Sequence, residues 1–127
     1  MLKSVTIPSN VKSIGDRAFF HCIGLKNVTI SDGVEIIYDF AFSWCTMIKS
    51  ITIPSSVKSI GEGAFYNCRS LTSVTIPSSV TSIGDEVFNM CDKKLEIHVP
   101  SDFNISKLKN SAIDISSQVF IDESIGI

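Results

Sequence analysis

The chain has 127 residues, which fits a single domain, and 44% of them are hydrophobic, which is enough for a continuous core. Its 11 basic and 13 acidic residues leave a formal net charge of −2, so charge gives no general attraction to nucleic acid or to an anionic membrane. No apolar run reaches the roughly 18 residues typical of a membrane-spanning helix. We therefore expect neither nucleic-acid binding nor membrane insertion, and no signal segment in this chain, because Met1 leads directly into the first repeat.

A 23-residue unit repeats along the chain without a slip of register. A unit of this size cannot bury its apolar side alone, so neighbouring units are expected to stack into one continuous core. We therefore treat residues 1–127 as a single repeat domain. Its predicted parts are repeats at residues 2–24, 25–47, 48–70 and 71–93, and a partial repeat with a C-terminal cap at residues 94–127.

Each repeat opens with a predicted short strand. In the third repeat, Ile51 and Ile53 are inward-type residues on either side of a polar one, an alternation typical of a strand. Pro54 then ends the strand, because proline cannot donate to a ladder. After the turn, Val57 and Ile60 provide a second pair of apolar positions and predict a second short segment. The partial repeat has Lys94 where the opening aliphatic residue is expected.

Each repeat closes with a small apolar residue, a phenylalanine and, three residues later, a cysteine, as in Ala64, Phe65 and Cys68, with Val87 in place of alanine in the fourth repeat. This spacing predicts a single helical turn with an acidic N-cap. A glycine precedes the acidic residue in three repeats, but the second repeat has Tyr38 there. We infer that the glycine provides room and does not serve a positive φ.

The four cysteines are expected to form one column, because equivalent residues of stacked strands lie about 4.8 Å apart. A column of free thiols in the core is the favoured interpretation. A disulfide between adjacent coils stays an alternative, since bridged Cα atoms are roughly 4.4 to 6.8 Å apart. Metal binding is disfavoured, because a straight file of thiols cannot surround a tetrahedral zinc ion. The column consists of Cys22, Cys45, Cys68 and Cys91.

The pattern L-x-S-V-T-I-P-S-S-V-x-S-I-G-x-x-A-F-x-x-C, which covers residues 2 to 93, resembles the BspA-like leucine-rich repeats. The resemblance implies a leucine-rich-repeat solenoid of about five coils, with short parallel β-strands on the concave side and short strands and helical turns on the other. It also implies a non-catalytic protein–protein interaction module for adhesion or surface recognition, at the cell surface or secreted. The alternative is a structural spacer or scaffold segment of a longer repeat array, for which a cytoplasmic location is open. The resemblance brings no catalytic residue, cofactor or metal, and the chain is not expected to be an enzyme.

The first candidate surface is the strand face, which we define as the outward positions of the predicted strands on the concave side. It is small and polar, and a protein ligand of unknown identity is its expected partner, although threonine is also simply favoured at solvent-facing strand positions. Beside it, Lys3, Lys26 and Lys49 stack in a file that could seat an acidic partner or form a solvated edge. The strand face consists of Ser4, Thr6, Asn27, Thr29, Ser50, Thr52, Ser73, Thr75, Glu96 and His98.

The alternative surface is the ridge, which we define as the outward row of the predicted helical turns. Exposed aromatic side chains and methionine anchor protein interfaces, although such rings also lie over neighbouring coils as the margin of a core. One ridge column differs in every copy, reading His21, Trp44, Asn67 and Met90, and this variation favours recognition over a spacer role. The ridge candidates are Phe20, His21, Phe40, Trp44, Tyr66 and Met90.

One set of residues resembles a catalytic triad on paper, namely Glu96 and His98 on one strand with Thr75 on the next. Residues two apart on a strand are separated by about 6.6 Å, and we expect this distance to keep the carboxylate from orienting the imidazole. We expect no reaction centre here.

The two ends of the stack are expected to differ. At the C-terminal end, residues 106–112 predict a helical turn, and Ile113, Ile115, Val119 and Ile121 predict a final strand over the last coil. At the N-terminal end, the first repeat has no coil stacked on it, and an open strand edge is a template for another chain. A homodimer through this uncapped coil is therefore a possible assembly.

Overall fold

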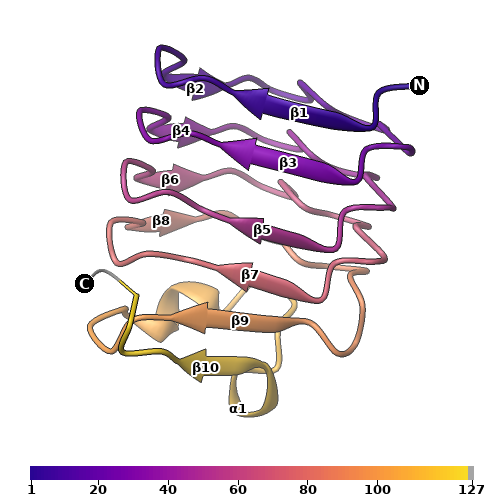
Figure 1. Cartoon of the computed structure of the whole chain (residues 1–127). Helices are drawn as coiled ribbons and strands as arrows, with labels where there is room; N and C mark the ends of the chain where they lie inside the picture. Colours follow the sequence, from indigo (N-terminus) through magenta and orange to yellow (C-terminus); the bar gives the residue numbers. More distant parts are fainter. Residues whose placement is uncertain (126–127) are drawn as a thin grey trace.

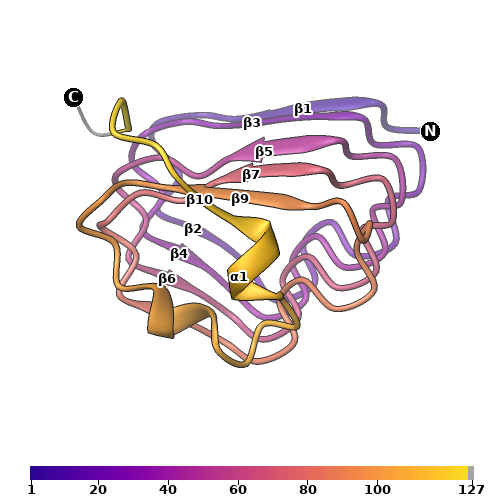
Figure 2. The same cartoon turned by 90° about the horizontal axis from the view of Figure 1, so that it is seen from below.

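The computed structural model describes residues 1–125 and shows a chain wound into stacked coils, which we number in the order of the repeats. Each of the first four coils places one longer strand on the front of the stack and a two-residue strand on the back, with the hydrophobic interior between them (Figures 1 and 2). The front strands are β1 (Ser4–Ile7), β3 (Asn27–Ile30), β5 (Ser50–Thr52), β7 (Ser73–Thr75), β9 (Glu96–Val99) and β10 (Val119–Ile121). The back strands are β2 (Ser13–Ile14), β4 (Ile36–Ile37), β6 (Ser59–Ile60) and β8 (Ser82–Ile83).

All strand pairs are parallel, and the register joins equivalent residues of successive repeats, as in Ser50 with Ser73 and Thr52 with Thr75. The back strands form one continuous sheet in the order β2, β4, β6, β8. The front strands form two sheets, β1 with β3 and β5 with β7, β9 and β10, so the front ladder is interrupted between β3 and β5. The predicted solenoid of about five coils is confirmed.

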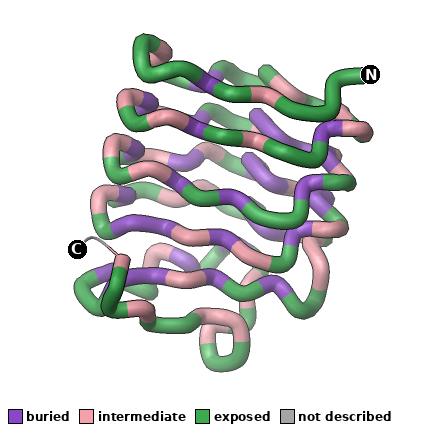
Figure 3. Tube along the Cα trace, viewed as in Figure 1, coloured by how far each residue is buried: buried purple, intermediate pink, exposed green. Residues whose placement is uncertain are grey.

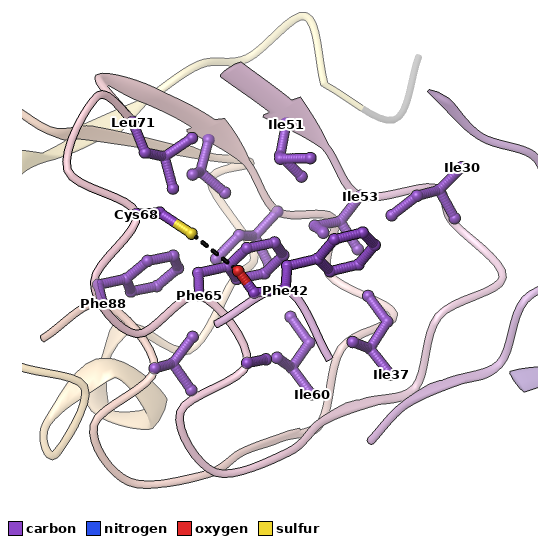
Figure 4. Close-up of a cluster of buried hydrophobic side chains, with 14 of the residues drawn as sticks. Ile30, Ile37, Phe42, Ile51, Ile53, Ile60, Phe65, Cys68, Leu71 and Phe88 are labelled. Atoms are coloured by element: carbon purple, nitrogen blue, oxygen red, sulfur yellow. Dashed lines mark hydrogen bonds between the residues drawn. The ribbon is translucent and has the colours of Figure 1, made fainter. Parts of the chain in front are cut away.

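The core consists of columns of like residues that run through the stack (Figure 4). In coil 3, Val57 and Phe65 have no exposed surface, and Ile51 and Ile53 are 2% exposed, as the strand alternation and the second apolar pair predict. Figure 3 shows that the first coil is mostly exposed or half-buried, in contrast to the coils below it. The phenylalanine column is stacked nearly parallel, with ring centroids 5.2 to 6.0 Å apart, and it runs through Phe19, Phe42, Phe65 and Phe88.

The closing segment of each repeat is not helical, so the predicted helical turn is wrong. In coil 2 the amides alternate: Phe42 and Trp44 donate to carbonyls of coil 3 at 2.8 Å, whereas Ser43 and Cys45 donate within their own coil at 3.2 Å. A helix would direct every amide into its own segment. Aiming alternate amides at the next coil instead places two residues of each of the first four coils at positive φ, as at Phe40 (55°) and Trp44 (64°). The equivalent positive-φ residues are Arg17, His21, Gly63, Asn67, Glu86 and Met90.

The glycine before the acidic residue provides room, as predicted. None of the three equivalents Gly15, Gly61 and Gly84 has positive φ. A Cβ built on Gly61 would lie 2.7 Å from the amide nitrogen of Asp39, in the backbone of the preceding coil, whereas a Cβ on Gly15 would meet nothing within 4 Å. At Gly61 and Gly84 the backbone of the preceding coil therefore leaves little room for a side chain, and the first coil has no such neighbour in the described structure. The second coil accommodates Tyr38 at the same position, so glycine is not required in every stacked coil.

The C-terminal residues cover the last coil in a way the sequence predicts only in part. Helix η1 (Ile105–Leu108) begins at the N-cap Asn104 and buries Leu108, at the edge of the predicted 106–112 turn. The predicted final strand is shorter than expected, because helix α1 (Ile115–Gln118) takes up Ile115 and only β10 pairs with β9. At the start of coil 5, Leu95 is 1% exposed and fills the aliphatic column, while Lys94 is exposed.

Candidate functional site

The residues of the strand face lie together on the front strands, where the parallel register aligns them in two adjacent files within each of the two front sheets. Asn27 donates from Nδ2 to the Ser4 hydroxyl oxygen at 3.4 Å. In the described part of the chain, the threonine hydroxyls of this face make no side-chain hydrogen bond, so they can take up partners from outside. The exposed members are Ser4, Thr6, Asn27, Thr29, Ser50, Thr52 and Glu96, and the half-buried ones are Ser73, Thr75 and His98.

The charges near the strand face are divided between its two ends. Lys3, Lys26 and Lys49 are all exposed beside the first three front strands, and no carboxylate of the described residues lies within 4.0 Å of their ammonium groups. The acidic residue of the face, Glu96, lies on β9 at the other end of the stack. Lys93 and Lys94 are also exposed just before β9, so what distinguishes the end that carries β1, β3 and β5 is its aligned file of three lysines.

Two aromatic side chains of the ridge are held by arginines of neighbouring coils. The Arg17 guanidinium lies 4.7 Å from the centroid of the Phe40 ring, and the Arg69 guanidinium lies 5.3 Å from the Trp44 ring. The His21 ring contacts Trp44 as well, with the centroids 5.8 Å apart. Such cation–π contacts contribute to cohesion between coils, so these rings serve as the margin of the core as well as surface.

The ridge is less exposed than a row of anchors would be. Phe20 is 43% exposed and Met90 is 55% exposed, and His21 is exposed, whereas Phe40, Trp44 and Tyr66 are half-buried. The expectation that Asn67 points outward in the same column is wrong. Its side chain is buried, and its Oδ1 accepts a hydrogen bond from Arg69 Nε at 2.6 Å. This burial could not be predicted from the repeat pattern, because the copies at this position share no residue type.

The expectation that Glu96 cannot reach His98 is also wrong, because Glu96 Oε1 and His98 Nε2 are 3.1 Å apart. Both side chains point to the same side of β9, and their combined length closes the separation of the backbone. The imidazole also stacks on Phe120 of β10, with ring centroids 5.6 Å apart. Thr75 makes no hydrogen bond to His98 within the described residues, so the three residues do not form a nucleophile–base pair.

The cysteines form the predicted column in the interior, and all four are free thiols. Burial raises the pKa of Cys45 and Cys91 to about 12 and that of Cys68 well above its ordinary value, so these thiols are protonated and unreactive at neutral pH. Among the described residues, no group of three or more histidine, cysteine or acidic side chains is arranged to hold a metal ion.

A family model described as BspA type leucine rich repeat region matches residues 1–122 with six copies of the repeat. The chain belongs to this BspA-type leucine-rich repeat family. The resemblance seen in the sequence is thereby confirmed, and repeat proteins of this kind are in general binding modules rather than enzymes.

Solved structures of other leucine-rich repeat proteins have the same fold. A T. pallidum leucine-rich repeat protein is 36% identical, with a TM-score of 0.71 over 76% of this chain and 44% of its own. A Bacteroides ovatus ATCC 8483 protein is 27% identical, with a TM-score of 0.79 over 95% of this chain and 30% of its own. A leucine rich cell surface protein of Faecalibacterium prausnitzii A2-165 is 31% identical, with a TM-score of 0.50 over 81% of this chain and 36% of its own.

The BspA-type chain thus spans less than half the length of each of these structures. No curated protein matches it. In the part of the chain that the structure describes, no helix has the length and apolar character needed to cross a membrane.

Proposed function

We propose that this BspA-type domain is a non-catalytic module that binds another protein on its strand face, in adhesion or surface recognition. The observation that supports this most is the file of threonine side chains, which are aligned along the front strands with their hydroxyls uncommitted inside the described structure. Uncommitted donors and acceptors on a fixed scaffold suit recognition, because little conformational entropy is lost when a partner orders them.

The ridge is the weaker candidate for partner binding. Its central rings at Phe40 and Trp44 already stack under arginines of the domain itself, so a partner gains less by covering them. Phe20 and Met90 are the ridge side chains with large exposed apolar surface, and they belong to different ends of the stack. An interface centred on the ridge therefore lacks the cluster of adjacent anchors that carries most binding energy in protein complexes.

We propose a location at the cell surface or outside the cell. The support is the Faecalibacterium prausnitzii structure, which is described as a cell surface protein and is 31% identical over 81% of this chain. A cytoplasmic location is the alternative, and fractionation of the source cells with an antibody against the domain distinguishes the two.

The alternative function is a structural spacer within a longer array, and the observation that favours it is the sameness of the serine and threonine files from coil to coil. A spacer needs only the coil-to-coil contacts. A binding module also needs its outward side chains, so substitutions on the strand face separate these functions.

The test uses photo-crosslinking groups placed singly at Thr52 on the strand face, Met90 on the ridge and Lys58 on neither surface. All three positions are exposed. We expect a defined protein adduct from Thr52 alone, and we expect Thr52→Lys to weaken binding of that protein by about tenfold or more, because an uncompensated charge is placed in the interface. An adduct from Met90 alone would assign binding to the ridge, and adducts from neither position would favour the spacer.

A further inference from the structure

The front of the domain has a break that the back does not share. Parallel ladders join β1 to β3 and continue from β5 through β7 and β9 to β10, but none joins β3 to β5. On the back, β4 and β6 are paired across the same two coils. The closing segments are bonded as well, since the Phe42 amide donates to the Ala64 carbonyl at 2.8 Å. The opening is thus confined to the strand face.

The break leaves backbone groups without the partners that their equivalents have. The Lys3 carbonyl accepts from the Lys26 amide at 2.8 Å, and the Lys49 carbonyl accepts from the Thr72 amide at 2.9 Å. Between coils 2 and 3 the equivalent bond is missing. In the described structure, the Lys26 carbonyl accepts no backbone hydrogen bond from the next coil, and the Lys49 amide donates none. An unpaired strand edge is a template for an extended chain, because its backbone groups gain by pairing.

A groove follows the break along the direction of the strands. Its wider end has a volume of about 370 Å³ and is lined by residues that include Lys26, Met47 and Lys49. It continues over Val28 and Ser50 into a second hollow of about 300 Å³ that reaches Pro54. On one side its lining runs along the chain from Lys26 to Ile30, and four residues of extended chain span about 13 Å, so the groove is long enough for a short peptide segment in strand conformation.

The width of the groove decides how such a segment would lie. Inserting a complete strand between β3 and β5 would require them to stand about 9.6 Å apart, which is twice the usual strand spacing. Cα atoms of β3 and β5 still come within 8 Å of one another. A ligand therefore lies along the mouth of the groove and reaches the Lys26 carbonyl and the Lys49 amide from outside.

The charges decide the chemistry of the ligand. Lys26 and Lys49 flank the wider end, Lys3 lies one coil beyond, and none has a carboxylate within 4.0 Å in the described structure. A carboxylate placed beside an ammonium group is favoured by their opposite charges even in bulk water. Met47, 38% exposed at the same end, adds a flexible apolar contact where the neighbouring repeats have Gly24 and Ser70.

We propose that this front groove is the binding subsite for an acidic, extended segment of the partner protein. Its carboxylates pair with Lys26 and Lys49, and its backbone pairs with the open carbonyl and amide. The inference rests on the proposed function of the strand face and specifies the part of the partner that is recognised.

The probe is a short, end-capped peptide of alternating glutamate and threonine, titrated into the ¹⁵N-labelled 127-residue chain. We expect amide shift changes concentrated at residues 27–30 and 49–52, and binding that weakens as salt is added. Lys26→Glu with Lys49→Glu should weaken binding by about tenfold or more, whereas Lys58→Glu, an exposed lysine away from the strand face, should change it less than about twofold.

Several results would overturn the groove as the subsite. They are shift changes mapped to other coils, equal binding of a lysine–threonine peptide, unchanged affinity of the double variant, or full competition by a single-stranded oligonucleotide, which would mean that charge alone is read. Hydrogen exchange gives a check without ligand: the Lys49 amide should exchange faster than the Lys26 and Thr72 amides, and equal protection would contradict the break. If the peptide does not bind while Thr52→Lys still abolishes binding of the crosslinked protein, the groove is not the subsite, and the proposed binding on the strand face stands.

Discussion

The thiol of Cys68 donates a hydrogen bond of 3.1 Å to the main-chain carbonyl of Phe42, one coil earlier in the stack (Figure 4). Cys45 and Cys91 repeat the arrangement with Phe19 and Phe65, each at 3.2 Å. The cysteine column is therefore more than a row of small apolar side chains, because each of these thiols joins its coil to the preceding one.

Replacing Cys68 by alanine should lower the free energy of unfolding by about 1–3 kcal/mol, because it removes the bond to Phe42 and leaves a small cavity. Urea unfolding monitored by circular dichroism measures the change. Cys22→Ala is the matched control, since Cys22 is half-buried in the first coil and has no coil before it. An equal loss in both variants would contradict the role assigned to the bond.

Stability should fall in alkaline solution because burial raises the pKa of these thiols in the folded state, from 9.0 to about 12 for Cys45. The protonated thiol stabilises the fold fully below pH 9, and this contribution is lost as the pH rises from 9 toward 12. The slope is about 1.4 kcal/mol per pH unit for each such thiol. Comparing unfolding of the wild type and Cys45→Ala across this range isolates the thiol from lysine and tyrosine, and parallel curves would refute the assignment.

Gly61→Ala should destabilise the domain by about 1–3 kcal/mol, because the new methyl group would meet the backbone of Asp39 in the preceding coil. Gly15→Ala, at the equivalent position of the first coil, has open space around the methyl group and should be neutral or stabilising by up to about 1 kcal/mol. Thermal unfolding of the two variants gives the comparison. Similar losses at both positions would mean that stacking does not set the demand for glycine.

The outer edge of β1 should pair with a second copy of the chain, since the described structure places no strand beyond it and Leu2 is 48% exposed nearby. Light scattering of the 127-residue chain at micromolar concentration should then give about twice the monomer mass. Ser4→Lys with Thr6→Lys should restore the monomer without unfolding, because both side chains are exposed. Ile7 is unsuitable for this test, because it is only 7% exposed and a lysine there would disturb the core. A wild-type monomer would exclude the pairing.

Most of the architecture could be predicted, because a strict period dictates which residues stack. Once Ile51, Val74 and Ile97 occupy equivalent positions, the parallel register and the core columns follow. The backbone of the closing segment could not be predicted in the same way. Its spacing of Phe65 and Cys68 fits a helical turn, and what overrides the helix is the presence of carbonyls on the next coil, which a single repeat does not contain.

For the candidate surfaces, too, some features could be predicted from the sequence and others could not. Exposure of Thr52 follows from simple alternation along a strand. The break beside it does not, because the strand residues of coils 2 and 3 read almost alike. The departures nearby are Met47 and Ser31, which stands where the other repeats have proline. The contact of Glu96 with His98 does not follow from backbone spacing alone, because it depends on the reach of the two side chains.

The interrupted front ladder also determines how the domain can bend. Coils 2 and 3 remain bonded along the back and through their closing segments, so these bonds form a hinge axis, and the least costly deformation widens or narrows the front between β3 and β5. Elsewhere the front ladders resist such bending. The solenoid thus consists of two stiff blocks, and whatever occupies the space between them on the front sets the angle at which the blocks meet.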